Sequence, residues 1–184
     1  MAEDIEEIAA LVRERNAIDH RIAAIIGRPH VSGHLGEWIA ARIFDIRLEL
    51  SAATAAIDGR FTTGALSGKT VNVKWYLKRE GLLDIAKAET LDYYLVLAGP
   101  PAPAGSSRGT ARPLCVNSVH LFDARQLGAE QRARDARVGV ASSVTKVQWQ
   151  RAEIYPVATN AVLTVSPTQS ALLALFHGDR SSPG

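Results

Sequence analysis

The stretch TVNVKWY, residues 70–76, decides how this sequence folds, because polar and apolar residues alternate along it. Alternation with a period of two is typical of a β-strand whose two faces meet different surroundings. Val71, Val73 and Trp75 are expected together on one face of this strand. Asn72 and Lys74 are expected together on the other face.

A second stretch, IDGRF at residues 57–61, is expected to pair with this strand. Asp58-Gly59 is a common turn signal and is expected to close the β-rich run before it. A hairpin of this kind brings Asp58 beside Asn72 and Lys74. The hairpin therefore predicts a carboxylate, an amide oxygen and an ammonium group in one place. The plainer alternative is that Asp58 starts a turn and pairs with Lys74 on an ordinary strand face.

At these residues the chain resembles the PD-(D/E)XK, or restriction-endonuclease-like, nuclease superfamily. In that family an Asp ends one strand, and an acidic-x-Lys triplet follows on the next strand. Here Asp58 stands in the Asp position, and Asn72-Val73-Lys74 stands in the triplet. The resemblance covers residues 31–97. Asn72 replaces the usual Asp or Glu, and some branches of the family, including Mrr-like enzymes, have Gln there.

The resemblance implies a restriction-endonuclease-like α/β fold, a mixed sheet flanked by helices, with Mg²⁺-dependent hydrolysis of DNA. Asp58 and Asn72 would hold Mg²⁺ or Mn²⁺, and Glu37 would be a third ligand from an upstream helix. Lys74 would orient the attacking water or stabilise developing negative charge. These four side chains are the expected catalytic residues. The alternative is an inactive nuclease-like domain that binds nucleic acid or a protein, which Asn72 favours because it removes one negative charge.

More than one residue could supply the carboxylates that would join Asp58 in the site. Glu37 falls in the first turn of a helix expected over residues 35–46. There it either complements the helix dipole or faces the central strand. Glu80 and Asp84, which follow that strand, are candidates for the charge that is missing at Asn72.

Positive charge is concentrated downstream of the motif. Residues 1–58 have six basic and ten acidic side chains, whereas residues 108–151 have eight basic and three acidic ones. Such a distribution suits a DNA backbone, although basic loops also occur on proteins that bind nothing acidic. Arg60, Lys78 and Arg79 are the expected phosphate contacts. The alternative for Lys78 and Arg79, in a loop or short helix after the central strand, is a solvated charge pair.

Residues 2–26 are predicted to form a helix, because apolar residues recur at three- and four-residue spacing. The repeating residues are Ile5, Ile8, Ala9, Val12, Ile18, Ile22, Ile25 and Ile26. Asn16 is a candidate break within this helix. The helix is expected to pack against the core or against a second subunit, which makes a homodimer a candidate assembly.

The chain is expected to form one α/β domain over residues 29–176. An N-terminal helical extension at residues 1–28 precedes it, and a flexible tail at residues 177–184 follows it. A chain of 184 residues that is 47% hydrophobic has enough apolar side chains for one well-buried core.

Several further elements are expected inside this domain. Asp123 and Ser166-Pro167 are predicted helix starts, and the second of these helices is expected to reach Phe176. An almost continuous apolar run is typical of a central strand covered on both faces, and other alternating runs predict shorter strands. The central run is 92–97, and the others are 47–50, 114–122, 144–149 and an edge segment at 154–156.

Composition excludes several classes of protein. Cys115 is the only cysteine, so an internal disulfide and a cysteine-based zinc site are both excluded. No run of roughly 18 apolar residues is available to span a membrane, and the N-terminus lacks a signal-peptide pattern. We therefore expect no membrane partner and a cytoplasmic location.

Overall fold

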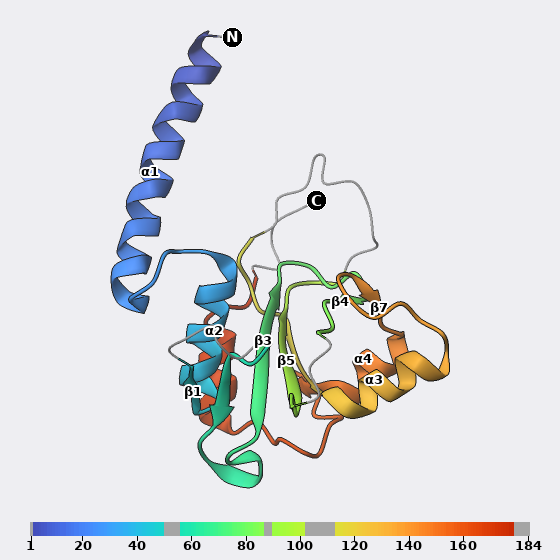
Figure 1. Ribbon diagram of the computed structural model, residues 1–184. Coiled ribbons are helices and arrows are strands. Elements are labelled where there is room, and N and C mark those ends of the chain that lie inside the picture. The colour runs from blue at the N-terminus through green and yellow to red at the C-terminus, as the bar shows by residue number, and fades with distance from the viewer. Residues whose placement is uncertain (1, 50–55, 87–89, 102–112, 179–184) are drawn as a thin grey trace.

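The computed structural model describes residues 2–49, 56–86, 90–101 and 113–178. In this part of the chain, six strands form one mixed sheet in the order β1-β2-β3-β5-β6-β8 (Figure 1). These strands are β1 (Ile46–Leu48), β2 (Gly59–Phe61), β3 (Thr70–Tyr76), β5 (Tyr93–Ala98), β6 (Ser118–Asp123) and β8 (Glu153–Tyr155). A separate two-stranded ribbon pairs β4 (Leu82–Leu83) with β7 (Ser142–Ser143).

Helices lie on both faces of the sheet within the described residues. They are α1 (Ala2–Ile26), α2 (Ser32–Ile43), α3 (Ala124–Ala133), α4 (Lys146–Ala152) and α5 (Pro167–Ala174), together with a 3-10 turn, η1 (Gly64–Leu66). α2 and α5 cover one face of the sheet, and α3 and α4 cover the other (Figure 1). The predicted mixed α/β sheet flanked by helices, with an N-terminal helix, is confirmed.

Strand β3 is the centre of this arrangement. It pairs antiparallel with β2, through Gly59 and Val71, and parallel with β5, where Asn72 is aligned with Tyr94. β5 and β6 are antiparallel neighbours, and so are β6 and β8. The predicted hairpin of β2 and β3 is therefore present, and β5 is the central strand that its apolar sequence predicts.

The predicted alternation along β3 is also present. Val71, Val73 and Trp75 belong to the apolar cluster under α2 and α5. Gly36 of α2 lies so close to Trp75 that a Cβ added there would come within 3.0 Å of the Trp75 Cβ. Because side chains alternate between faces, Asn72 and Lys74 belong to the face that α3 and α4 cover.

The bounds of α2 differ from the prediction. The helix begins at Ser32 and ends at Ile43, whereas residues 35–46 were expected. Asp45 has a positive φ of 51°, so the chain turns there and Ile46 enters β1 instead of continuing the helix. Glu37 consequently lies beyond the first turn, which has no acidic residue. The interpretation of Glu37 as a first-turn dipole partner is wrong.

Two other local predictions are wrong. Residues 144–149 were expected to form a strand, but most of them form α4. Thr145 caps this helix, and its hydroxyl accepts from the Gln148 N–H while the Gln148 side chain accepts from the Thr145 N–H. The segment after β3 was expected as a loop or short helix, but Leu82 and Leu83 form β4.

The other predicted helix starts are confirmed. Asp123 caps α3 by accepting a hydrogen bond from the Gln126 N–H. Ser166 caps α5 through a capping box, with Pro167 at the start of the helix. This helix ends at Ala174, two residues before the predicted Phe176.

α1 is one helix from Ala2 to Ile26, and Asn16 does not interrupt it. It extends away from the sheet and its helices (Figure 1). Ile26, at its end, is buried, and the His30 Nδ1 atom lies 2.8 Å from the Asp19 carboxylate. Most of its other apolar side chains are exposed, so the expected packing against the core is limited to its last turns.

Within the described residues, no helix is long and apolar enough to cross a membrane. The predicted tail begins at His177, and its residues 179–184 lie outside the described part of the chain. The division into extension, domain and tail stays a prediction.

Candidate functional site

Asp58 immediately precedes β2, which begins at Gly59. It does not lie at the end of a preceding strand, as was expected. Its backbone N–H donates to the Val71 carbonyl at 2.9 Å. One carboxylate oxygen, Oδ2, accepts from the Val73 N–H at 2.7 Å. β2 pairs only with the first part of β3, so the carboxylate takes the place of a strand partner for Val73.

Three charged side chains act on this carboxylate. Burial is the largest influence on Asp58 and raises its pKa, while the hydrogen bond from Val73 lowers it. The nearby Glu37 carboxylate raises this pKa further, and the cationic groups of Lys74 and Arg28 lower it. The structure therefore brings together three of the predicted site residues, Asp58, Glu37 and Lys74, and adds Arg28.

Asn72 completes the predicted set. Its side chain is 4% exposed, and its Oδ1 atom has no hydrogen-bond partner within the described residues. The Asp58 N–H bonds to the Val71 carbonyl, so Asp58 lies beside the residue that precedes Asn72 on β3. A buried acceptor without a partner costs about 1–3 kcal/mol. The Asn72 amide oxygen is therefore a buried acceptor for which the described residues supply no donor.

Glu37 has a partner that sequence reasoning did not identify. An Arg28 Nη1 atom lies 2.5 Å from Glu37 Oε2, and the Glu37 side chain is only 18% exposed. Arg28 belongs to the connector between α1 and α2, nine residues before Glu37, and helical spacing gives no signal for such a pair. This ion pair competes with any cation for the Glu37 carboxylate.

The two candidates for the missing charge have other partners. The Glu80 carboxylate pairs with Lys78 at 2.5 Å. Asp84 Oδ1 accepts from the Ala141 N–H at 2.8 Å, and the Asp84 N–H donates to the Tyr76 hydroxyl at 2.9 Å. These contacts hold the β4 segment in place. They give the Glu80 and Asp84 carboxylates partners within the protein, so neither position needs a metal to account for it.

The predicted phosphate contacts differ in accessibility. Arg60 is the most exposed, with 43% of its side chain accessible, and it lies 3.6 Å from Glu49. Lys78 is 15% exposed and is paired with Glu80. The Arg79 guanidinium lies over the Trp149 ring, 6.0 Å from its centroid. Of the three, Arg60 is the best placed to meet a ligand from solution.

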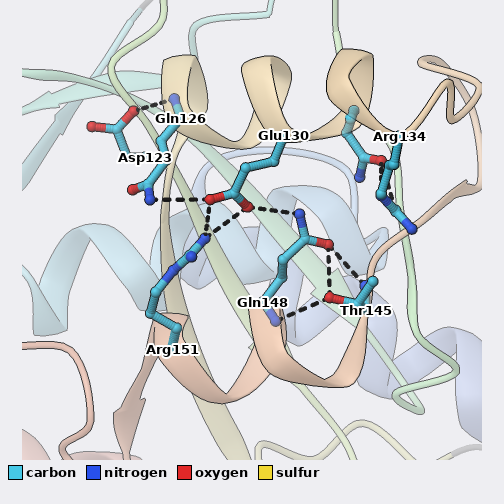
Figure 2. Close-up of polar contacts among 8 residues, drawn as sticks. Asp123, Gln126, Glu130, Arg134, Thr145, Gln148 and Arg151 are labelled. Atoms are coloured by element: carbon cyan, nitrogen blue, oxygen red, sulfur yellow. Dashed lines mark hydrogen bonds and ion pairs between the residues drawn. The ribbon is translucent and has the colours of Figure 1, made fainter.

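A polar network between α3 and α4 was not expected from the sequence. Figure 2 shows Glu130 accepting hydrogen bonds from Gln126, Gln148 and Arg151, at 3.1, 2.8 and 2.7 Å. The hydrogen bond from Arg151 is the largest of the influences that lower the Glu130 pKa. These bonds occupy both Glu130 oxygens, so the network joins the two helices.

A cavity of about 280 Å³ lies beside this network, between the α3–α4 helices and the chain after β8. Arg151 and Gln148 line it, together with Asn160. The Asn160 side chain already bonds the Leu121 carbonyl and the Val162 N–H. Several of the polar groups that line this cavity therefore already have partners within the chain.

Among the residues that the structure describes, no three His, Cys, Asp or Glu side chains form a group able to hold a metal ion. The predicted site instead has three oxygen-bearing side chains, which are the carboxylates of Asp58 and Glu37 and the amide of Asn72. No model of a known protein family matches the chain, and no curated protein matches it. The superfamily resemblance therefore stays a prediction based on the motif and its geometry.

Proposed function

We propose that this protein is a metal-dependent nuclease that hydrolyses phosphodiester bonds in DNA. One observation supports this proposal above the others. Lys74 of β3 and Glu37 of α2 are close enough to Asp58 to shift its pKa, and the Asp58 carboxylate accepts from Val73, the middle residue of the Asn72-Val73-Lys74 triplet. The motif predicts this set of residues, and they come from three separate elements of the chain.

The donor atoms suit a hard divalent cation such as Mg²⁺ or Mn²⁺, which prefers carboxylate and carbonyl oxygens. Asn72 Oδ1 is buried and has no partner among the described residues, and Asp58 has one oxygen beyond the one that accepts from Val73. The raised pKa of Asp58 is also typical of a carboxylate that is buried for function. Glu37 becomes a third ligand only when Arg28 releases it.

Each residue has a role that follows from its charge. A bound cation supplies a water of lowered pKa and neutralises charge on the phosphate. Asp58 and Asn72 would hold the cation through their oxygens. Lys74, which already lowers the Asp58 pKa, would place its ammonium group beside the developing negative charge of the phosphate. Arg60 would contact the DNA backbone nearby.

A second candidate function is binding of nucleic acid or a protein without cleavage. The observation that favours it is the Arg28–Glu37 ion pair, which leaves Asp58 and the neutral Asn72 as the remaining donors. A site with one free carboxylate holds Mg²⁺ weakly, because affinity for hard cations rises with ligand charge. The two candidates differ in whether cleavage occurs at all.

The test is cleavage of linear and supercoiled DNA by purified protein with Mg²⁺, Mn²⁺ or Ca²⁺. Wild type should cleave with Mg²⁺ or Mn²⁺, and Ca²⁺ should support little cleavage because its looser coordination positions water poorly. Lys74→Ala should lower the rate by roughly 10²-fold. Lys69→Ala is the control, because Lys69 is exposed and pairs with Asp92 instead.

Two outcomes would contradict the nuclease proposal. Equal cleavage by wild type, Lys74→Ala and Asp58→Ala would show that a contaminating nuclease is responsible. DNA binding without cleavage in every metal would favour the second candidate.

A further inference from the structure

α1 exposes an unusual number of large apolar side chains. Ile5 is 71% exposed, Ile8 60%, Val12 49%, Ile18 49% and Ile25 70%. Ile22 is half-buried near the end of the same stripe. Isolated helices are marginally stable in water, and most helical stability comes from packing of an apolar face. Along this stripe α1 therefore lacks the apolar packing that usually stabilises a helix.

The stripe has an internal symmetry. Six apolar positions form three pairs that are related by inversion of the helix about Arg15. In each pair, the two residues lie equally far from Arg15 along the chain, one on each side. The pairs are Ile5 with Ile25, Ile8 with Ile22, and Val12 with Ile18. Two copies of α1 that run antiparallel, centred on Arg15, therefore bring these six residues opposite one another, while Leu11, which is 52% exposed, falls opposite Asp19. An unrelated partner gives no reason for such a pattern.

The polar break in the stripe is compatible with this pairing. Arg15 lies 3.5 Å from Asp19 on its own helix. Where two antiparallel helices cross at Arg15, Asp19 of each copy lies one turn from the Arg15 of the other. Each guanidinium therefore has a carboxylate within reach in both copies, which offsets the repulsion between the two Arg15 side chains.

A membrane surface is a poorer partner for this helix. Helices that lie on membranes usually have Lys and Arg on the polar face and Trp or Phe on the apolar face. α1 has no Lys and no aromatic residue, and Glu6 and Glu7 are exposed near its start. Anionic lipids would repel that end of the helix.

We infer that α1 pairs with α1 of a second copy of this chain, as an antiparallel two-helix interface centred on Arg15. The seam consists of Ile5, Ile8, Val12, Ile18, Ile22 and Ile25. Because a 25-residue helix is about 37 Å long, the two sheet domains lie at opposite ends of the pair.

The first experiment measures the mass of the full-length protein by light scattering during gel filtration, over a range of micromolar concentrations. Wild type should be a dimer. Ile18→Glu should weaken the dimer by roughly 100-fold or more, since two buried isoleucines are lost per dimer. Ala17→Glu is the matched control, because Ala17 is the exposed neighbour on the opposite side of the helix, and this variant should remain dimeric. Circular dichroism checks that both variants keep their helical content.

Other results would overturn the inference. A monomeric wild type would do so, and so would a dimer that Ile18→Glu leaves unchanged, since its interface would lie elsewhere. Monomeric protein that binds phosphatidylserine vesicles through α1 would instead identify a lipid surface as the partner.

Discussion

The carboxylate of Asp58 accepts a hydrogen bond from the backbone N–H of Val73, with 2.7 Å between Oδ2 and the nitrogen. Val73 is the middle residue of the Asn72-Val73-Lys74 triplet, so this bond joins the start of β2 to the triplet on β3. Burial nevertheless keeps the Asp58 pKa above its usual value. The protein therefore holds a carboxylate where its charged form is disfavoured, which is the arrangement expected of a functional group.

Asp58→Asn should make the protein more stable at neutral pH. The new amide oxygen can still accept from Val73, and the cost of burying a charge disappears. We expect the free energy of unfolding to rise by about 0.5–1 kcal/mol, measured by urea denaturation. Cleavage activity should be lost in the same variant, because a neutral amide binds a hard cation less well than a carboxylate.

Asp92→Asn is the control for that measurement. Burial works to raise the Asp92 pKa, but hydrogen bonds from Thr70 and Lys69 together hold it below its usual value. Its charged form therefore stabilises the fold, and Asp92→Asn should lower stability. A loss of stability in Asp58→Asn as well would support the plainer interpretation, in which Asp58 is a turn residue paired with Lys74.

Asn72→Asp should make the stability of the fold depend on metal. Asn72 is buried, so a second carboxylate beside Asp58 should lower the free energy of unfolding by about 2 kcal/mol without metal. Mn²⁺ should then raise the melting temperature of this variant more than that of wild type, because it binds the folded state. Asn160→Asp, away from the site, is the control. A melting temperature that Mn²⁺ does not change in Asn72→Asp would contradict a metal site at Asp58.

Arg28→Gln should strengthen metal binding. Removing the guanidinium frees the Glu37 carboxylate, which lies 2.5 Å from it in the structure. We expect Mn²⁺ affinity to rise by roughly tenfold, which corresponds to one charge-assisted hydrogen bond of about 1.4 kcal/mol. Arg47→Gln, on the exposed side of β1, should leave the affinity unchanged. Weaker binding in Arg28→Gln would mean that Arg28 supports the site instead of competing for it.

His120 should make the fold sensitive to acid. It is fully buried between the Trp149 carbonyl and the Ser118 hydroxyl, and burial, with a smaller effect of Arg79, lowers its pKa to about 4. The unfolded chain takes up a proton near pH 6.5 and the folded chain does not. Stability is therefore complete above pH 6.5 and falls as the pH drops towards 4, by up to about 3 kcal/mol.

His120→Gln isolates this effect, since the amide keeps polar partners but does not titrate. Urea denaturation at several pH values should show a smaller loss of stability for the variant between pH 6.5 and 4. Equal losses in both proteins would assign the acid sensitivity to other groups.

Local sequence patterns predicted the elements that depend on local physics. The spacing of apolar residues gave both ends of α1, and the Asp123 and Ser166 caps marked α3 and α5. The alternation from Val71 to Trp75 gave the faces of β3. The sequence of α4 has two conflicting signals, because residues 144–149 alternate like a strand while Thr145 and Gln148 stand three residues apart as in a capping box.

The site was predictable only as a set of residue types. The β2–β3 hairpin is present, and Lys74 is close enough to Asp58 to lower its pKa. Nothing in the local pattern indicated that Arg28 would reach Glu37, because this contact depends on how the connector after α1 folds over α2. The contact of Arg79 with Trp149 likewise depends on tertiary packing between segments 70 residues apart in the chain.

The most direct test of the proposed site is calorimetric titration of Mn²⁺ into wild type and Asp58→Asn at neutral pH and low salt. The Asp58 site predicts one saturable binding site in wild type and none in Asp58→Asn, with Asp92→Asn binding as wild type does. Binding that is absent from wild type, or equal in wild type and Asp58→Asn, would contradict a metal site at Asp58 and with it the proposed nuclease.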